Sequence, residues 1–507
     1  MKKHIFIMNM ESRALMYGVG TYTKQLISAL KLANFHITVV TLYADTGGEL
    51  TVSHKREVRF IHFPKPSIDG YDQLFFTRED NAYQKGVYYN LLSFIPKDED
   101  IYFHFNFMEL SAIAQLLKIN MSCKIILTVH YTFWSFELEG DVAKLHRIIE
   151  QPDNQWESGI QKSFLNDKFF LNDIAGYVIA IANHSAQMLN TLYGVDASKI
   201  TLIPNGLDDN YQERTMEDKR GIRKRFCIGE HEKVLLFVGR VTPVKGVGQL
   251  IEAFKLVLEQ LPDSRLIIVG EGLERDMQHS FKQCCPVWSK ICFTGYVPKD
   301  IILELYAVAD IGIVPSIHEE FGYVAVEMMM AYLPVLANKT TGLLDIIEEN
   351  VTGTFVTIER DNPEFSRLFA SKIVSLLQNA GILGKYAQNG RRIFMERYVS
   401  TCFYENILSF YNRVNIEQMA GSEKPYELIF LIMVLKKMSI GELQSDSNEV
   451  LLRERMKAIK AGKKAGDCYV YCHNGNWGLA YSCSDGSWIC GSSGGWLCTT
   501  WDDSPCE

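Results

Sequence analysis

The stretch KVLLFVGRVTPVKG, residues 233–246, decides how the rest of the chain is interpreted. After its first lysine it forms a continuous apolar run, typical of a strand buried on both faces of a parallel sheet. A glycine ends the run, and a short loop with two cations follows. Strands and amphipathic helices alternate after this loop, so residues 206–413 are predicted to form a doubly wound α/β domain.

The same alternation already occupies the first part of the chain. It predicts another doubly wound domain over residues 1–205, with a helix at 18–33 after the first strand. The predicted strands are 5–9, 36–42, 58–63, 101–105, 124–129, 176–181 and 199–203. The predicted fold class is therefore α/β, with two Rossmann-like domains facing a cleft at the carboxyl ends of their strands, plus a small Cys/Trp-rich tail.

Composition excludes several functional classes. The chain has 507 residues, with 52 Lys plus Arg against 60 Asp plus Glu and a net charge of −8. Nucleic-acid binders use a basic field to neutralise phosphates, so no nucleic-acid partner is expected. Since no apolar stretch suits a signal peptide or a membrane-spanning helix, a cytoplasmic location is expected.

Two glycine-containing loops are candidates for phosphate binding. Gly18 and Gly20 open the first helix, whose N-terminus would attract an anion, although a tight turn explains them equally well. Gly239 ends a strand, and Arg240 and Lys245 lie on the loop that follows. The side chains of these two cations would point into the cleft, where they could bind a diphosphate. Two solvated surface cations are the alternative.

The strongest cluster is VPSIHEEFGYVAVE, residues 314–327, in which a strand ends and a loop leads onto a helix. Glu319 and Glu327 are spaced so that one carboxylate can serve the hydroxyls of a sugar and the other those of a ribose. Gly322 permits a close turn onto the helix. Glu320 is an alternative to Glu319 as the sugar ligand, and acids that cap a helix are the alternative without any ligand.

Together these loops resemble glycosyltransferase family 4, over residues 1–413. The residues that carry the resemblance are Gly239-Arg240, Lys245-Gly246, Glu319 to Glu327, LIPNGLD at 202–208, LLDII at 343–347 and Gly353. It implies the GT-B fold and transfer of a sugar with retention, from a nucleotide-diphosphate sugar to a glycan, lipid-linked or peptide acceptor. It implies no metal and no other cofactor, and a lipid-linked acceptor would bring peripheral contact with a membrane.

The resemblance also implies a role for each residue. Arg240 and Lys245 would stabilise the departing nucleotide diphosphate. Glu319 would hold the donor sugar and Glu327 the ribose. His130, at a strand end, would face the transferred sugar, although alone it would be interpreted as a satisfied loop histidine. The remaining donor-binding residues are Gly18, Gly20, Gly239, Phe321, Gly322, Tyr323 and Val324.

A mechanism without a metal is consistent with these residue types. Breaking the bond between sugar and diphosphate leaves negative charge on phosphate, which a fixed Arg and Lys can stabilise. The acidic stretch 98–100 precedes a predicted strand instead of following one, so it does not fit a metal-binding D-x-D motif. No carboxylate of the first domain stands out as a nucleophile, so front-face displacement, with the departing phosphate helping to deprotonate the acceptor, is the hypothesis.

The twelve cysteines divide into six scattered over the first 402 residues and six among the last 40. The first six lie outside every motif and are expected to be free or structural thiols. Residues 414–466 are predicted to be a linker and a leader-like helical segment, and 467–507 a Cys-rich tail. This part resembles a ribosomally made peptide precursor with a Gly-type processing site at Gly462 or Gly466, of the kind encoded beside glycosyltransferases in Bacteroidetes clusters.

Several alternatives stay open. The tail could be the sugar acceptor, an exported disulfide peptide, a disordered segment, or a zinc module built on Cys468, Cys472 and His473. Two other functions also fit the chain. One is a nucleotide-sugar epimerase of the same fold, which would isomerise a sugar without an acceptor. The other is a carrier fusion whose main output is the tail peptide.

Overall fold

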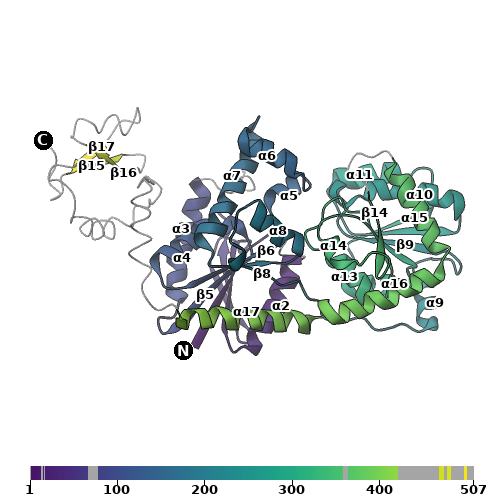
Figure 1. Ribbon diagram of the computed structural model, residues 1–507, viewed down its shortest axis with the longest axis horizontal. Helices are drawn as coiled ribbons and strands as arrows, with labels where there is room; N and C mark the ends of the chain where they lie inside the picture. The colour runs from purple at the N-terminus through teal and green to yellow at the C-terminus, as the bar shows by residue number, and fades with distance from the viewer. Residues whose placement is uncertain are drawn as a thin grey trace. The chain divides into compact units, whose positions relative to one another are not determined.

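The computed structural model describes residues 2–12, 15, 18–66, 78–357, 364–420, 468–472, 477–480 and 496–499. The chain divides into two compact units, Met1–Val414 and Asn415–Glu507. The first unit contains every residue of the predicted site and consists of two α/β halves (Figure 1).

The first half is built on an eight-stranded sheet with the order β3-β4-β2-β1-β5-β6-β7-β8. Its strands are β1 (Lys2–Met10), β2 (His36–Ala44), β3 (Thr51–Lys55), β4 (Val58–Pro64), β5 (Glu99–Phe105), β6 (Lys124–Val129), β7 (Tyr177–Ala180) and β8 (Ile200–Leu202). All neighbours are parallel except β3 and β4. The predicted strands are confirmed, whereas β3 was missed because all its side chains are exposed and it shows no apolar pattern.

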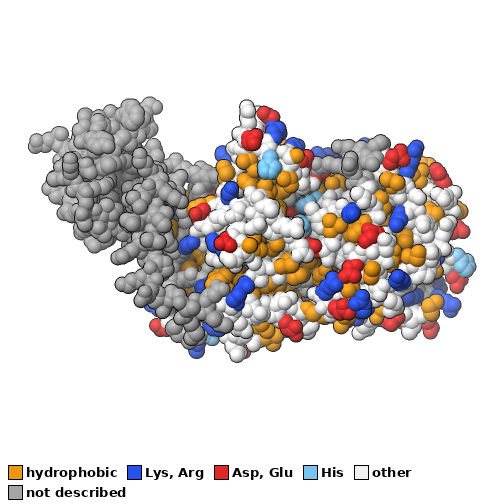
Figure 2. Space-filling view, in the orientation of Figure 1, with side chains coloured by type: hydrophobic (Ala, Val, Ile, Leu, Met, Phe, Trp, Pro, Cys, Tyr) orange, Lys and Arg blue, Asp and Glu red, His pale blue; other side chains and the backbone are white. Residues whose placement is uncertain are grey.

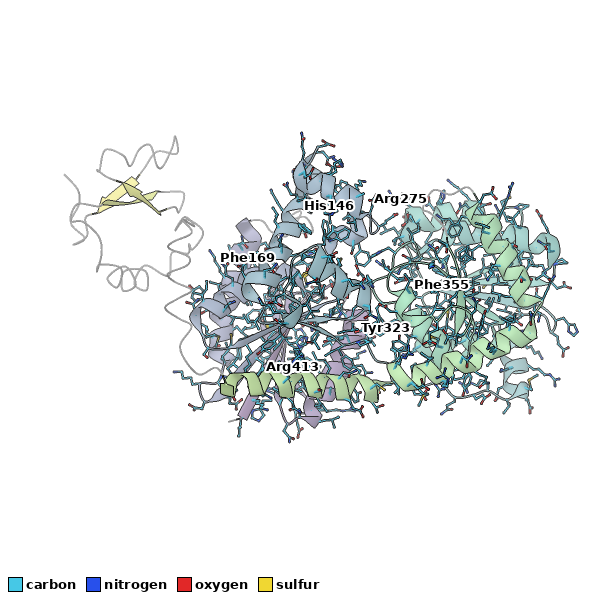
Figure 3. The ribbon with its side chains drawn as sticks, viewed as in Figure 1. His146, Phe169, Arg275, Tyr323, Phe355 and Arg413 are labelled. Atoms are coloured by element: carbon cyan, nitrogen blue, oxygen red, sulfur yellow. The ribbon has the colours of Figure 1, made fainter. Side chains whose placement is uncertain are left out.

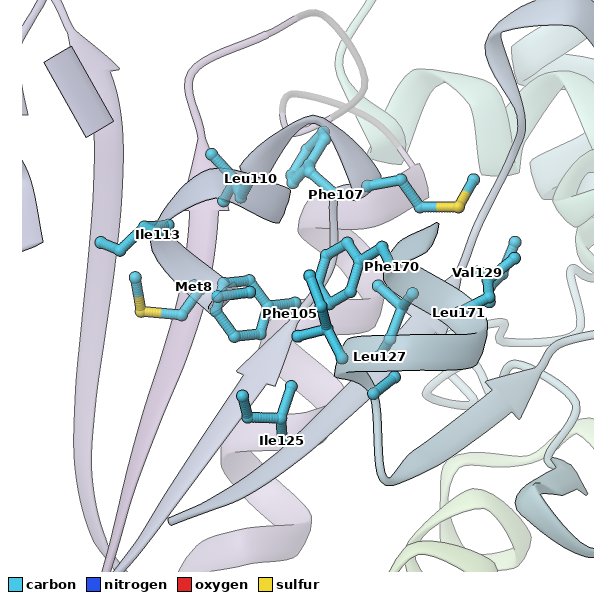
Figure 4. Packing of buried hydrophobic residues seen from close by; sticks show 14 of the residues in the cluster. Met8, Phe105, Phe107, Leu110, Ile113, Ile125, Leu127, Val129, Phe170 and Leu171 are labelled. Carbon is cyan, nitrogen blue, oxygen red and sulfur yellow. The ribbon is translucent and has the colours of Figure 1, made fainter. Parts of the chain in front are cut away.

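Helices cover both faces of this sheet (Figure 1). They are α2 (Gly18–Leu32), α3 (Arg78–Leu91), α4 (Ser111–Asn120), α5 (Phe133–Glu137), α6 (Val142–Glu150), α7 (Gln155–Phe169) and α8 (Asn183–Thr191). Figure 4 shows part of the core, where Phe105 and Leu127 of neighbouring strands pack with Phe170 and Leu171. Full burial of each such side chain contributes about 1.5–3 kcal/mol, and this packing fixes the strand ends that carry the site.

The second half contains a six-stranded parallel sheet with the order β11-β10-β9-β12-β13-β14. Its strands are β9 (Lys233–Val238), β10 (Ser264–Val269), β11 (Ile291–Gly295), β12 (Ile311–Val314), β13 (Val335–Asn338) and β14 (Gly353–Val356). Strand β9 lies inside the sheet, as its apolar run predicts, with Val234 to Phe237 buried. The prediction of a second doubly wound sheet is therefore confirmed.

The helices of this half are α9 (Met216–Arg225), α10 (Val247–Gln260), α11 (Glu274–Gln283), α12 (Lys299–Val308), α13 (Tyr323–Met330), α14 (Leu343–Ile346), α15 (Phe365–Leu377) and α16 (Ala380–Ile393). The sequence did not predict α9 and α11. Both are rich in charged residues and bury one residue each, Ile222 and Ser280, so they lack the apolar stripe that identifies a helix.

Helix α17 (Ser400–Ala420) belongs to the first unit up to Val414, and this part packs along the first half (Figure 1). Phe403, Ile407 and Tyr411 lie in the same buried cluster as residues of β1 and α2. The Tyr411 hydroxyl is 2.6 Å from His104 Nδ1 on β5. Although the sequence predicts residues 206–413 as one domain, the part from Ser400 onward thus belongs to the core of the first half.

In the second unit, three short strands form an antiparallel sheet with the order β16-β15-β17. They are β15 (Cys468–Cys472), β16 (Trp477–Ala480) and β17 (Trp496–Thr499). The predicted leader helix and processing site lie outside the described residues, as do the side chains on which the zinc and disulfide alternatives depend.

The surface agrees with the composition. On the face shown in Figure 2, Lys and Arg side chains are interspersed with Asp and Glu side chains, so no broad basic field is visible. Among the described residues, no helix combines the length and apolar character needed to span a bilayer. The six cysteines of the first unit are free thiols, as expected.

Candidate active site

The predicted site residues follow the carboxyl ends of strands in both halves, where doubly wound sheets bind ligands. His130 comes directly after β6, Gly239 after β9, and Glu319 lies on the loop after β12. Tyr323 begins α13 and lies where the two halves meet (Figure 3). A Cβ atom added to Gly18 would lie 3.5 Å from the Tyr323 ring. The start of α2 therefore contacts the 319–327 loop of the second half.

Lys245, on the loop after β9, and Glu319, on the loop after β12, form an ion pair. Lys245 Nζ lies 2.5 Å from Glu319 Oε1, and Ser316 Oγ donates a hydrogen bond of 2.9 Å to the same oxygen. The two side chains are only 16% and 15% exposed. The structure thus brings together Lys245, the predicted phosphate ligand, and Glu319, the predicted sugar ligand, at the carboxyl ends of β9 and β12.

A tight turn positions Lys245. The short 3₁₀ helix Pro243–Lys245 ends at Gly246, whose φ of 71° is in the left-handed region. A Cβ atom on Gly246 would lie 2.2 Å from the carbonyl oxygen of Pro315. Glycine is required here for two reasons, since its conformation is costly for other residues and no room exists for a side chain. The turn therefore presses the Lys245 loop against the end of β12.

We expect Gly246→Ala to lower the free energy of unfolding by at least about 2 kcal/mol, because left-handed strain costs about 1–2 kcal/mol and the clash adds to it. Gly221→Ala is the matched control, since Gly221 lies in α9 with nothing within 4 Å of an added Cβ. That control should gain about 0.5–1 kcal/mol. Chemical denaturation measures the free energy of unfolding of both variants. Equal stability of the two would show that the turn does not require glycine at position 246.

The Arg240 side chain contacts a residue of the first half. Its guanidinium carbon lies 5.9 Å from the centre of the Phe136 ring on α5. The same ring makes an edge contact of 6.4 Å with His318. Gly140 follows α5 with a φ of 80°, and a Cβ there would lie 2.7 Å from His318 Nδ1. Helix α5 and the turn after it therefore pack directly against the loops that carry Arg240 and Glu319.

The turn onto α13 also depends on glycine. Gly322 caps the helix with a φ of 97°, and an added Cβ would lie 2.7 Å from Leu343 Cδ2. Phe321 and Tyr323 on either side pack their rings 5.1 Å apart. The Tyr323 hydroxyl is buried and has no hydrogen-bond partner among the described residues. Buried hydroxyls are normally satisfied, so this one is a candidate ligand contact beside Gly18.

Glu327 lies on α13 and accepts a hydrogen bond of 3.0 Å from the Tyr306 hydroxyl. Lys299 Nζ is 3.7 Å from its other oxygen. Burial raises the pKa of Glu327, and the nearby Lys299 opposes this rise. A carboxylate with so few donors around it has acceptor capacity for the hydroxyls of a ligand.

His130 is buried at the end of β6. Its Nε2 lies 3.2 Å from Asn106 Oδ1, and its ring packs edge-on against Tyr22 at 4.5 Å. Burial lowers the pKa of His130 to about 3. Its imidazole is therefore neutral at physiological pH, and it can offer a hydrogen bond but no positive charge. Its contact with a transferred sugar stays a prediction.

A largely buried cluster that the sequence did not predict joins the two halves. We call it the cross-domain cluster, and its members are Ser135, His184, His318, Glu320 and Asp345. Ser135 Oγ donates to Glu320 Oε1 at 2.5 Å, and His318 Nε2 lies 3.1 Å from the same oxygen. The His184 nitrogens lie 3.5 Å from Glu320 and 3.9 Å from Asp345, distances of ion pairs and not of short hydrogen bonds.

Charge compensation sets the protonation states of this cluster. Burial alone would raise the pKa of Glu320, but the nearby His184, together with hydrogen bonds from His318 and Ser135, holds this pKa well below its usual value. Burial opposes the protonation of His184, yet the carboxylates of Asp345 and Glu320 raise its pKa to about 9. Glu320, an alternative sugar ligand by sequence, is thus engaged in an ionic contact between the halves.

Two Rossmann-like halves that face each other define the GT-B class. Residues 16–211 match the family described as Glycosyltransferase Family 4, and residues 218–392 match the family described as Glycosyl transferases group 1. The chain therefore contains GT4-like and group 1 glycosyltransferase domains in a GT-B arrangement, as the resemblance implied.

Known proteins agree with this classification. An uncharacterized glycosyltransferase of Methanocaldococcus jannaschii is 30% identical over 44% of this chain and 56% of its own length. A D-inositol 3-phosphate glycosyltransferase of Catenulispora acidiphila is 30% identical over 36% of this chain and 45% of its own length. The chain thus spans about half the length of these relatives.

Solved structures share the fold. Sucrose-phosphate synthase from Thermosynechococcus elongatus gives a TM-score of 0.65 at 19% identity, over 82% of this chain and 100% of that chain. Anabaena HepE, in complex with UDP and glucose, gives a TM-score of 0.60 at 18% identity, over 80% of this chain and 99% of that chain. These likenesses establish the GT-B architecture of the first unit.

Proposed function

We propose that the chain is a glycosyltransferase that moves a sugar from a nucleotide-diphosphate sugar to an acceptor, with retention at the anomeric carbon. The observation that carries the proposal is the ion pair between Lys245 and Glu319 on the loops after β9 and β12. The helix that follows, α13, carries Glu327 and begins at Tyr323, which lies against Gly18 of the other half. The UDP and UDP-glucose complexes of HepE support the donor class.

In this proposal Lys245 and Arg240 stabilise the leaving diphosphate. Negative charge develops on the phosphate as its bond to the anomeric carbon breaks, and fixed cations beside it lower the barrier. Both residues lie on the loop after β9, held by the Gly246 turn. Because two cations supply this stabilisation, we propose that transfer needs no metal ion.

Donor binding would change the partners inside the site. A diphosphate replaces Glu319 as the partner of Lys245, and sugar hydroxyls then donate to the freed Glu319 carboxylate. The neutral His130 would contact the sugar from the first half. The acceptor is proposed to be a glycan, a lipid-linked precursor or a peptide that includes the Cys-rich tail.

The test is incubation of the full chain with a panel of nucleotide sugars and candidate acceptors, followed by nucleotide release and product mass. Transfer predicts release coupled to an added sugar, and a chelator should leave it unchanged. NMR of the new bond reports retention or inversion. An isomerised sugar without an acceptor would favour the epimerase alternative, and no reaction with any combination would favour the carrier alternative.

We expect Glu327→Ala to weaken binding of the donor's nucleoside diphosphate about 10- to 100-fold, because a hydrogen bond to a charged group contributes about 1.5–3 kcal/mol. Calorimetric titration with UDP and GDP measures this effect. Glu304→Gln is the control, since Glu304 is a partly exposed carboxylate of α12 that pairs with Arg225. Unchanged affinity of Glu327→Ala for a diphosphate that binds the wild type would remove Glu327 from the donor site.

A further inference from the structure

His4, His36 and Glu99 meet at the amino-terminal end of the strands of the first sheet, whereas the candidate active site lies at the carboxyl-terminal end. They stand at or near the amino ends of the neighbouring strands β1, β2 and β5, whereas His130 and the other site residues follow carboxyl ends. The strand register places His4 directly beside His36. The histidines are 95 and 63 residues from Glu99 in the sequence, so no local spacing reveals the group.

The three side chains converge on one point. His4 Nδ1 lies 3.2 Å from Glu99 Oε2, and His36 Nδ1 lies 3.0 Å and 3.1 Å from the two Glu99 oxygens. One ligand atom from each residue lies within 4.8 Å of the other two. Zinc bonds of about 2.0–2.2 Å in a tetrahedral site place neighbouring ligands about 3.3–3.6 Å apart. The atoms therefore need only small shifts to share an ion.

The surroundings orient this group. His4 Nε2 lies 2.8 Å from Thr38 Oγ1, the kind of outer contact that fixes the ring of a metal-bound histidine. The His4 ring also stacks on Phe6 at 4.5 Å. Arg59 donates to the same Thr38 hydroxyl at 3.0 Å, and this nearby positive charge lowers the affinity for any cation. The His36 side chain is 51% exposed, which leaves a path for an ion and a water.

We propose that His4, His36 and Glu99 bind a divalent transition ion of the zinc type, with water as a further ligand. Two imidazoles and one carboxylate suit Zn²⁺, Co²⁺ or Ni²⁺, whereas Mg²⁺ and Ca²⁺ prefer oxygen ligands. The ion binds side chains of three neighbouring central strands, β1, β2 and β5, and so stabilises the fold. It lies away from the cleft and takes no part in sugar transfer. The competing explanation is that both imidazoles simply donate hydrogen bonds to Glu99.

The test uses Co²⁺ as a spectroscopic probe on the full chain, because thiols of the Cys-rich tail can also bind metals. Wild type is expected to bind one Co²⁺ with visible bands that lack thiolate charge transfer, and Zn²⁺ should displace it. Glu99→Gln and His36→Ala should each lose this ion or bind it at least tenfold more weakly. His146→Ala, which removes an exposed imidazole on α6, should keep it.

A rise in melting temperature with Zn²⁺ should likewise occur in wild type and in His146→Ala but not in Glu99→Gln. Equal Co²⁺ binding by wild type and Glu99→Gln would overturn the proposal and leave hydrogen bonds as the explanation. The same holds if wild type binds no Co²⁺ outside the thiolate bands. Neither result depends on whether the chain transfers sugar.

Discussion

Replacing Lys245 with alanine is expected to lower the rate constant of sugar transfer by about 10²–10³-fold, because one fixed donor aimed at developing charge contributes about 2.7–4 kcal/mol. Lys245 is held by the Gly246 turn and pairs with Glu319 at 2.5 Å. Its loss therefore removes the cation and leaves the Glu319 carboxylate with the Ser316 hydroxyl but no cationic partner. Lys245→Arg should recover part of the rate, since it keeps the charge but not the compact shape of the ammonium group.

The measurement is kcat at saturating donor, with thermal unfolding to show that the variant is folded. Lys255→Ala is the matched control, because Lys255 forms an ion pair of 2.9 Å with Glu252 on α10, outside every motif of the site. It should transfer sugar at the wild-type rate. Transfer by Lys245→Ala at that same rate would contradict the role proposed for this loop.

The fold was predictable wherever local chemistry carries the signal. A continuous apolar run such as β9 identifies a strand buried on both faces, and the alternation of such runs with amphipathic helices identifies two parallel sheets. Exposed or highly charged elements gave no such signal. Strand β3 is exposed along its length, and α9 buries only Ile222.

Long-range packing explains the remaining difference. Tyr411 on α17 contacts His104, which lies 307 residues earlier, and Phe403 packs on Tyr22. The apolar face of α17 predicts that the helix packs on something, but nothing in its own residues says on which half. The sequence therefore assigned it to the preceding domain, whereas the buried cluster includes residues of the first strand.

The same division applies to the site. Glu319, Gly322 and Glu327 could be predicted as candidates because they are close together in the sequence, on the loop after β12 and the helix that follows it. The ion pair between Lys245 and Glu319 joins two such motifs that are 74 residues apart, and only the fold brings them together. The contact between Ser135 and Glu320 spans 185 residues and two halves, so no pattern of neighbouring residues could indicate it.

The cross-domain cluster predicts a dependence of stability on pH. The folded pKa of His184 is about 9, above its usual value of 6.5. Its contribution is therefore fully present below about pH 6.5, and it is lost as the pH rises through about 9. A shift of this size corresponds to up to about 3 kcal/mol. His184 holds Glu320 and Asp345 across the two halves, so the contact between the halves should weaken over the same range.

We expect His184→Gln to lower the free energy of unfolding by about 2–4 kcal/mol near pH 6.5, because the variant leaves the Glu320 and Asp345 carboxylates without the cation that they share. The difference between wild type and variant should shrink as the pH rises from about 6.5 through about 9, since wild-type His184 has lost its proton only above that range. Denaturant unfolding at several pH values measures this, and His146→Gln, an exposed histidine on α6, controls for histidine titration elsewhere. Parallel stability curves for wild type and His184→Gln would show that His184 carries no charge that holds the two halves together.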